Sequence, residues 1–260
     1  MRLKRIGTLW AAAGLLSCAI QAQDTDVKGF EARVYRYGAD KAMRYRLFVP
    51  PAYDASQKFP LVIWLHGIDA VGSDNVKQIT SFNYAGSHTW TQARVQEKHP
   101  CFVLAPQLPF GGTWGLPLTN EPSGHLLRVL DIMRLLEREF SIDEGRIYVV
   151  GQSLGGMGTW SIVAARPELF AAAVPVCGAG NIFKAKELAK VPIWAFHALD
   201  DPIVPVIGSK TMVDAVRKAG GTVKYTEYKS GLHNAWDRAF NDPDMIEWLF
   251  AQKRGSQPSH

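Results

Sequence analysis

Three residues of this sequence have types that together could do hydrolytic chemistry: a serine, an aspartate and a histidine. Ser153 lies between Gly151 and Gly155, directly after the apolar run "RIYVV". A serine hydroxyl is a poor nucleophile at neutral pH, but a histidine can accept its proton during attack and then deliver that proton to the leaving group. An aspartate can hold the histidine in the required tautomer and stabilise its charged form. Asp201 and His233 follow further along the chain, each after another β-rich run.

The order of these residues is itself informative. Ser153, Asp201 and His233 each follow a run that is typical of a strand, and the order Ser, Asp, His is that of the α/β-hydrolases. Asp200 competes with Asp201 for the role of the acid. We favour Asp201 because it directly precedes "PIVP", a turn that can fix its carboxylate. His233 lies in a glycine-containing turn after the last expected strand, where a base is needed.

The same chemistry needs donors for the negative charge that develops on the substrate oxygen. A helix is expected to begin at Leu154, so the N–H of Leu154 is one candidate donor, and the N–H of Ile68, in the loop after "WLHG", is the second. Trp114 in "FGGTWG" and Trp236, three residues beyond His233, are candidates for the walls of a substrate pocket. Core packing is the alternative for both tryptophans.

The other histidines do not suggest a metal site. His66 and His197 end apolar runs and are expected to bond backbone or loop groups. The sequence contains neither an HExxH motif nor a cysteine pair with ligand spacing. We therefore expect no metal and no other cofactor. The histidines without ligand spacing are His88, His99, His125 and His260.

The elements that must position these groups alternate along the chain. After an expected antiparallel hairpin, continuous apolar runs typical of doubly buried parallel strands alternate with helical periodicity. This pattern predicts an α/β-hydrolase-type α/β fold, with a mostly parallel sheet, an N-terminal antiparallel hairpin and helices on both faces. Sites in such sheets gather at the carboxyl ends of the strands. The expected strands are 30–38, 43–50, 60–67, 101–107, 146–152, 171–178, 191–200 and 222–229, and the expected helices are 123–140, 154–167, 208–221 and 242–254.

No large cap domain is expected over the site. Only the segment "AGNIFKAKELAK" separates the strand ending in "PVCG" from the strand beginning "VPIW". That length suffices for one short helix. The cleft around Ser153 is therefore expected to be open and walled by loops.

The first residues resemble a secretory leader. A basic start, "MRLKR", precedes a short apolar run and then small and polar residues. We interpret residues 1–22 as a signal peptide and residues 23–260 as a single domain, exported to the periplasm or the exterior. Cys18 in "LLSC" leaves a second interpretation open, a lipid anchor at that cysteine.

Charge and cysteine content exclude some partners. The formal net charge is +5, and residues 1–22 contain three basic and no acidic residues, so the mature chain carries 5 − 3 = +2. This balance gives no reason to expect nucleic acid binding, and no run is long enough to predict a membrane span. Cys101 and Cys177 are expected at opposite ends of the sheet and therefore unpaired.

Several motifs taken together resemble a known family. The segments "YRLFVPPAYDASQKFPLVIWLHG", "IDEGRIYVVGQSLGGMGTW", "HALDDPIVPV" and "GLHNAWDRAF" are similar to the secreted esterase-like branch of the α/β-hydrolases. That branch includes feruloyl and acetylxylan esterase-type enzymes, polyhydroxybutyrate-depolymerase-like proteins and predicted peptidases. The resemblance covers residues 40–250. It implies that Ser153 is the nucleophile, Asp201 the acid and His233 the base.

The resemblance also bears on the surroundings of the serine. It implies oxyanion donors at Ile68 and Leu154, and it matches Gln152 and Gln107 to recurring positions near the site. The sequence departs from the family after "HG", where "IDAV" replaces a glycine-containing run.

The function expected from all of this is that of a secreted serine carboxylic ester hydrolase. The expected substrates are short-chain or carbohydrate-linked esters of the acetyl or feruloyl type, either small or attached to a polymer. A serine peptidase of the same fold, a polyester depolymerase and an inactive binding protein on this scaffold are the alternatives.

Overall fold

The computed structural model describes residue 27, residues 29–115 and residues 122–255. The expected leader, its cleavage point and Cys18 lie outside the described residues. Within the described part of the chain, no helix is both long enough and apolar enough to cross a membrane.

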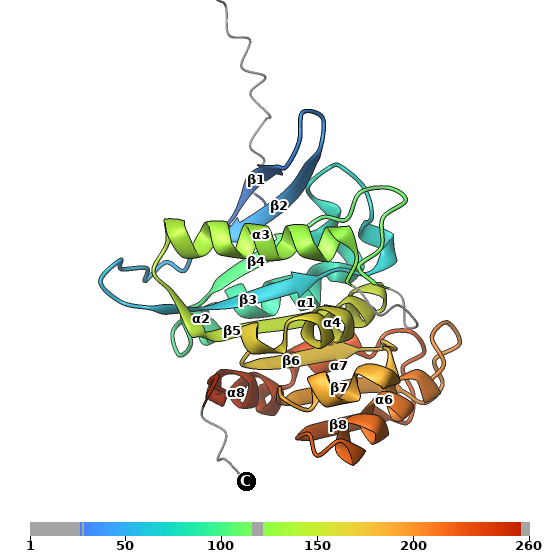
Figure 1. The fold of residues 1–260 in the computed structure, drawn as a ribbon. Coiled ribbons are helices and arrows are strands. Elements are labelled where there is room, and N and C mark those ends of the chain that lie inside the picture. The colour runs from blue at the N-terminus through green and yellow to red at the C-terminus, as the bar shows by residue number, and fades with distance from the viewer. Residues whose placement is uncertain (1–26, 28, 116–121, 256–260) are drawn as a thin grey trace, which may run out of the picture.

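One eight-stranded sheet organises the molecule (Figure 1). Its strand order is β1-β2-β4-β3-β5-β6-β7-β8. The pairs β1–β2 and β2–β4 are antiparallel, and all later pairs are parallel. The predicted hairpin followed by a parallel sheet is therefore confirmed. The strands are β1 (Phe30–Arg36), β2 (Ala42–Phe48), β3 (Phe59–Leu65), β4 (Phe102–Pro106), β5 (Ile142–Gln152), β6 (Ala172–Val176), β7 (Ile193–Ala198) and β8 (Val223–Tyr228).

Helices cover both faces of the sheet, and each face has its own core. One core holds buried side chains of α3 (Gly124–Glu139), α4 (Leu154–Ala165), α5 (Ala185–Leu188) and α6 (Ile207–Lys218). The other core holds side chains of α2 (Ala93–Gln96), α7 (Trp236–Asn241) and α8 (Pro243–Ala251), near the short α1 (Tyr84–His88). In Figure 1, α3, α4 and α6 lie in front of the sheet.

The central strands supply both cores by alternation. Along β3, Leu61, Ile63 and Leu65 belong to one core, while Val62 and Trp64 belong to the other. Successive side chains of a strand point to opposite faces, so a continuous apolar run is what a strand covered on both sides requires. The expectation of doubly buried strands is confirmed here.

The long segment between β3 and β4 contains structure that apolar periodicity did not predict. Residues 66–101 form α1, α2 and four short 3-10 turns, with bounds Ile68–Ala70, Lys77–Ile79, Ser81–Asn83 and Thr89–Thr91. These pieces are too short to show a repeating apolar pattern. The segment between β6 and β7 is as short as expected, with a 3-10 turn at Ile182–Lys184 and α5, and it forms no cap domain.

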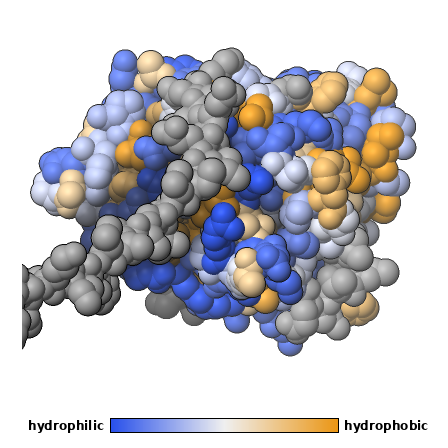
Figure 2. Space-filling view, turned by 90° about the horizontal axis from the view of Figure 1, so that it is seen from above, coloured by the Kyte–Doolittle hydropathy of each residue, from blue (hydrophilic) through white to orange (hydrophobic). Residues whose placement is uncertain are grey.

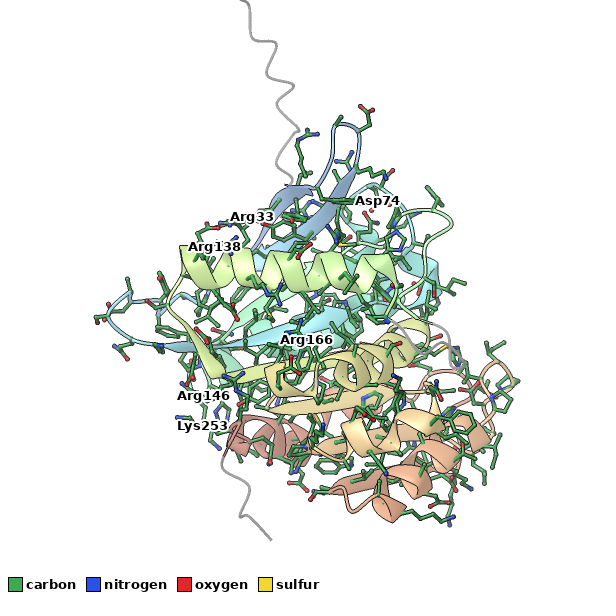
Figure 3. All side chains as sticks on the ribbon, in the orientation of Figure 1. Arg33, Asp74, Arg138, Arg146, Arg166 and Lys253 are labelled. Carbon is green, nitrogen blue, oxygen red and sulfur yellow. The ribbon has the colours of Figure 1, made fainter. Side chains whose placement is uncertain are left out.

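The surface is charged along the helices and apolar near the carboxyl ends of the strands. Arg33 on β1 reaches across to α3, where its Nη1 lies 2.7 Å from Oε1 of Glu139 (Figure 3). Figure 2 shows hydrophobic residues gathering on its right-hand side, the side toward which β3 points in Figure 1. Exposed apolar residues in loops after strands include Ile68, Phe82 and Ile203.

The two cysteines that the structure describes are both free and buried. Cys101 immediately precedes β4 and Cys177 immediately follows β6, so they lie at opposite ends of the sheet.

His66 ties the end of β3 to the loop after β4. It is fully buried, its Nε2 accepts from the Leu108 N–H at 2.9 Å, and its Nδ1 lies 2.6 Å from the Gly67 carbonyl oxygen. Nε2 must therefore be unprotonated and Nδ1 must carry the hydrogen. Burial lowers the pKa of His66 to about 4, against smaller opposing effects of the Gly67 carbonyl and Asp74.

This buried histidine predicts a loss of stability in acid. Between pH 6.5 and 4 the unfolded chain protonates His66 while the folded chain does not, so the free energy of unfolding falls as the pH falls, by about 3 kcal/mol over that window. Urea unfolding at pH 7.5 and pH 4.5 measures this. His66→Gln should be less stable at pH 7.5 but should lose about 2–3 kcal/mol less than the wild type on acidification. An equal acid loss in both proteins would contradict the assignment.

Candidate active site

Ser153 lies on a sharp turn between β5 and α4, at the carboxyl edge of the sheet. Its φ of 53° and ψ of −118° place a non-glycine residue in the left-handed half of backbone space, which stores strain. The turn is so tight that a Cβ at Gly155 would collide with the Leu65 carbonyl oxygen, and a Cβ at Gly151 would collide with Gly155. The two glycines around Ser153 are thus a steric requirement of the turn.

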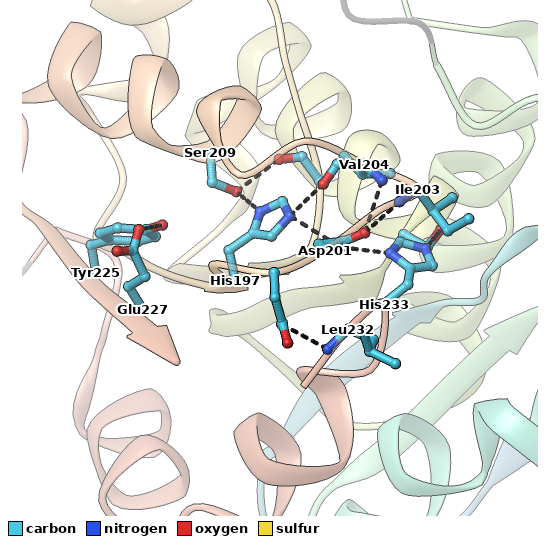
Figure 4. A network of polar contacts seen from close by, with 12 residues as sticks. His197, Asp201, Ile203, Val204, Ser209, Tyr225, Glu227, Leu232 and His233 are labelled. Atoms are coloured by element: carbon cyan, nitrogen blue, oxygen red, sulfur yellow. Dashed lines mark hydrogen bonds and ion pairs between the residues drawn. The ribbon is translucent and has the colours of Figure 1, made fainter. Parts of the chain in front are cut away.

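The structure brings Ser153, His233 and Asp201 together, and Figure 4 shows His233 beside Asp201. Nε2 of His233 lies 2.8 Å from Oγ of Ser153, and Nδ1 of His233 lies 2.7 Å from Oδ2 of Asp201. The three side chains come from the loops after β5, β7 and β8. Because these strands are parallel, their carboxyl ends meet at one edge. This geometry allows the imidazole to take a proton from the serine while the carboxylate faces its other nitrogen.

The Asp201 carboxylate is almost fully hydrogen-bonded. Its Oδ1 accepts from the N–H groups of Ile203 and Val204, both at 2.9 Å, and its Oδ2 faces His233. Burial raises the pKa of Asp201, but the hydrogen bonds from His233, Val204 and Ile203 outweigh that effect and hold the pKa below its usual value. The group is therefore a carboxylate at neutral pH, as stabilisation of an imidazolium requires.

Asp200 has a different place. Its Oδ1 accepts from the Leu232 N–H at 2.8 Å, which anchors the loop that carries His233. Leu232 itself has a φ of 51°, so the loop is held in a conformation that a leucine rarely adopts. The structure thus pairs Asp201 with the imidazole and leaves Asp200 to fix the loop.

Ile68 and Leu154 both open a helical turn beside Ser153. Ile68 begins the 3-10 turn Ile68–Ala70, and Leu154 begins α4. The first N–H groups of a helix have no partner within the helix, and they point toward its N-terminal end. Both positions can therefore offer an N–H to an oxygen on a carbon bonded to Oγ of Ser153.

A cavity of about 260 Å³ opens in front of Ser153. Most of its wall is apolar. Among its described lining residues, Asp69 is the one acidic residue. Gln152 and Trp236 line the cavity, in agreement with their expected proximity to the site. The lining residues are Ile68, Asp69, Phe82, Gln152, Ser153, Ile203, His233 and Trp236.

The expected wall role of Trp114 is wrong. Trp114 is fully buried, belongs to the core under α3 and α4, and donates its Nε1–H to the His66 carbonyl oxygen at 3.1 Å. Its ring also meets the ring of His66 edge-on, with centroids 5.2 Å apart. Core packing, the alternative interpretation, is what the structure shows.

Gln107 also lies away from the cavity. Its Oε1 accepts from the Asn75 N–H at 2.7 Å, and its Nε2 donates to the Ala70 carbonyl oxygen at 3.1 Å and to Oδ1 of Asp74 at 3.2 Å. Gln107 therefore fixes the conformation of the loop after β3 and does not line the cavity.

Sequence reasoning missed the residues that hold the oxyanion side of the cleft. The buried Asn83 accepts from the Gly67 N–H through Oδ1 at 3.0 Å and donates through Nδ2 to Oδ2 of Asp69 at 2.7 Å. Burial raises the pKa of Asp69, against the opposing effect of the Asn83 hydrogen bond. Phe82 and Ile203 add apolar walls. Asn83 and Gly67 are far apart in the chain, and no sequence spacing predicts that they meet. For Asp69, the one indication was the departure "IDAV" from the family pattern.

One group of potential metal ligands lies at this site. Cys177, Asp201 and His233 offer ligand atoms that lie within 4.8 Å of one another. Metal binding needs the thiolate form of a cysteine. Burial raises the pKa of the Cys177 thiol to about 12, so the thiol stays protonated at neutral pH.

The chain is similar to one sequence family and to solved structures of esterases. The sequence pattern of the prolyl oligopeptidase family matches residues 128–187. A crystal structure of a thermostable esterase superposes with a TM-score of 0.83 at 41% identity, covering 87% of this chain and 64% of that one. A ferulic acid esterase of Anaeromyces mucronatus superposes with a TM-score of 0.64 at 13% identity, covering 87% of this chain and 93% of that one, and shows the fold alone.

Acetylxylan esterases are among the curated proteins whose sequences are similar to this chain. A bifunctional acetylxylan esterase/xylanase of Neocallimastix patriciarum is 29% identical over 150 residues, which are 56% of this chain and 20% of that protein. The chain spans 20–30% of the length of the first curated relatives that it matches. Together with the strand order and the turn at Ser153, these similarities show that the chain has the α/β-hydrolase fold and is similar to esterases of that fold.

Proposed function

We propose that this protein is a serine carboxylic ester hydrolase that forms an acyl-enzyme on Ser153. The observation that carries the proposal is the pair of hydrogen-bond contacts in series, from Oγ of Ser153 to His233 at 2.8 Å and from His233 to Asp201 at 2.7 Å. The left-handed turn at Ser153 supports it, because that turn presents Oγ to the cavity beside two helix N-termini.

The reaction follows from this arrangement. Nε2 of His233 takes the hydroxyl proton as Oγ of Ser153 bonds to the carbonyl carbon. The carbonyl oxygen becomes an oxyanion, which the N–H groups of Leu154 and Ile68 can bind. His233 then gives the proton to the departing alcohol oxygen, and the carbon–oxygen bond of the ester breaks. A water molecule repeats the sequence on the acyl-enzyme and releases the acid and the free serine.

The cavity supports a short or single-ring acyl group as the substrate class. Its volume of about 260 Å³ lies below the usual range of pockets for drug-sized ligands. Phe82, Ile203 and Trp236 give it an apolar wall, and the described residues between β6 and β7 place no cap over it. An open cleft of this size suits short-chain esters and esters that protrude from a carbohydrate. The names of the relatives, an acetylxylan esterase and a ferulic acid esterase, support the same class.

A peptidase is the second candidate. The match of residues 128–187 to the prolyl oligopeptidase family favours it, because the same three side chains can also cleave an amide. The difference is the leaving group, an amine that His233 would have to protonate.

We also propose that the protein is exported after removal of residues 1–22. The support is the basic start and short apolar run of that segment. Mass spectrometry of protein from its native host should find an N-terminus at Gln23. A retained Met1 would contradict export, and a diacylated N-terminal Cys18 would show lipid anchoring in place of cleavage after residue 22.

The proposed function predicts how hydrolysis responds to acyl length, to the leaving group and to loss of Ser153. Purified protein should cleave p-nitrophenyl acetate and butyrate faster than the palmitate, with no rate jump when substrate forms micelles, and faster than a peptide p-nitroanilide. Ser153→Ala should lower kcat by about 10⁴–10⁶ and abolish labelling by a serine-directed phosphonate. Asp200→Asn keeps an oxygen that can accept from the Leu232 N–H, so it should cost far less activity than Ser153→Ala. Anilide cleavage faster than ester cleavage would favour the peptidase, and unchanged labelling of Ser153→Ala would exclude Ser153 as the nucleophile.

Asp69 predicts a preference for positively charged over neutral esters. Its carboxylate lines the cavity and is fixed by Asn83, while the other walls are largely apolar. A substrate cation within several ångströms of it gains about 1 kcal/mol, or about fivefold in kcat/KM. The matched pair is butyrylthiocholine and its neutral carbon analogue, 3,3-dimethylbutyl thiobutyrate, at pH 8. Asp69→Asn, which keeps the shape, should remove the preference, and added salt should weaken it. An unchanged ratio in Asp69→Asn would show that the carboxylate does not sense the substrate.

A further inference from the structure

A second histidine touches the Asp201 carboxylate from the side away from Ser153. His197 is the penultimate residue of β7, is fully buried, and lies four residues before Asp201. Its Nε2 is 3.2 Å from Oδ2 of Asp201 and 2.9 Å from the Val204 carbonyl oxygen (Figure 4). The same carboxylate oxygen faces Nδ1 of His233 at 2.7 Å. Two imidazoles therefore meet one oxygen atom.

The partners of His197 define where its hydrogen is. Both atoms in front of Nε2 are oxygens that can only accept, so Nε2 carries the hydrogen. Nδ1 faces the Ser209 hydroxyl at 2.7 Å, which can donate. Burial lowers the pKa of His197, against the opposing effects of Val204 and Asp201, which favours the neutral ring. A hydrogen on Nε2 satisfies both contacts of that nitrogen.

Ser209 anchors this arrangement to the scaffold. It is fully buried on α6, and its hydroxyl lies 2.9 Å from the Gly178 carbonyl oxygen as well as 2.7 Å from His197. The hydroxyl has one hydrogen, which it can give either to the Gly178 carbonyl oxygen or to Nδ1 of His197. The ring is thus fixed between a helix and the turn after β7.

His197 holds the acid through two routes. Directly, its Nε2–H faces Oδ2 of Asp201. Indirectly, it binds the carbonyl oxygen of Val204, and the N–H of the same residue donates to Oδ1 of Asp201 at 2.9 Å. A shift of that turn would rotate the carboxylate away from His233. Small displacements of catalytic groups cost rate because the reacting geometry is narrow.

We propose that His197 is a positioning residue of this site, which holds Oδ2 of Asp201 toward Nδ1 of His233 before substrate binds. The proposal rests on the proposed ester hydrolysis for its kinetic consequence. His197 does not line the cavity, so it should affect the chemical step and leave substrate binding unchanged. Removing its donor should therefore lower kcat by about 10–100-fold with little change in KM.

The experiment compares variants that differ in the donor. His197→Gln places an amide donor near the position of Nε2, whereas His197→Phe keeps a planar ring without a donor. Ser209→Ala leaves His197 in place but removes the hydroxyl that contacts its Nδ1. His88→Phe is the matched control, since His88 is also buried but contacts Ser87, Phe30 and Tyr84. The readouts are kcat and KM on p-nitrophenyl acetate, Tm, and the low-field proton resonance of the His233–Asp201 hydrogen bond in substrate-free protein.

The expected result is a graded loss. His197→Phe should lose the low-field resonance and 10–100-fold in kcat, His197→Gln should recover most of both, and Ser209→Ala should lose kcat several-fold at unchanged KM. His88→Phe should change Tm alone. If His197→Phe does not fold, the other two variants decide. A wild-type kcat and resonance in Ser209→Ala would overturn the proposal. A loss of kcat in His197→Gln as large as that of Ser153→Ala would overturn it as well.

The two proposals fail separately. Absence of ester hydrolysis and of phosphonate labelling in the wild type would refute the proposed function, while the dependence of the low-field resonance on His197 and Ser209 would still test the positioning role. Conversely, an active wild type whose kcat and resonance survive in His197→Phe would refute the positioning role alone.

Discussion

The close approach of α4 to β3 is the constraint on which the site depends. Gly155, in the first turn of α4, lies so near the Leu65 carbonyl oxygen that no side chain fits between them. This contact draws the start of the helix over the carboxyl ends of β3 and β5 and forces Ser153 into its left-handed conformation. The same approach brings the Ile68 turn and the Leu154 turn to one side of the serine. A looser packing would separate the hydroxyl from the N–H groups that could bind an oxyanion.

The second requirement is a carboxylate that stays charged although it is buried. Taking a carboxylate out of water is costly unless hydrogen bonds replace the lost hydration. Around Asp201 the backbone of the following turn supplies two donors, and the imidazoles of His233 and His197 face its other oxygen. Because the donors come from a turn and a loop that are themselves fixed, the charge is solvated by groups that need not reorganise when the neighbouring imidazole becomes charged.

The loop after β3 gives this protein its individual cleft. A glycine-containing run was expected there from the resemblance, and the sequence has "IDAV" instead. Two buried amide side chains hold this loop in place. Gln107 bonds to Ala70 and Asp74, and Asn83 bonds to Gly67 and Asp69. The consequence is one carboxylate and one exposed isoleucine at the entrance, where relatives of the expected pattern would present small residues.

The sequence by itself determined the fold class and the preference for Asp201 over Asp200. It also determined that Ser153, Asp201 and His233 each follow a parallel strand. It could do so because long apolar runs report burial on both faces of a sheet, and because parallel strands bring their carboxyl ends together whatever the details of packing. Only the tertiary structure decided the contacts of Trp114, Gln107, Asn83 and His197. An aromatic ring in a glycine-rich loop can face a cavity or the core, and a buried amide or imidazole can bind any peptide group within reach. Those choices depend on contacts between segments far apart in the chain, such as residues 67 and 83, or 66 and 114, which no local pattern encodes.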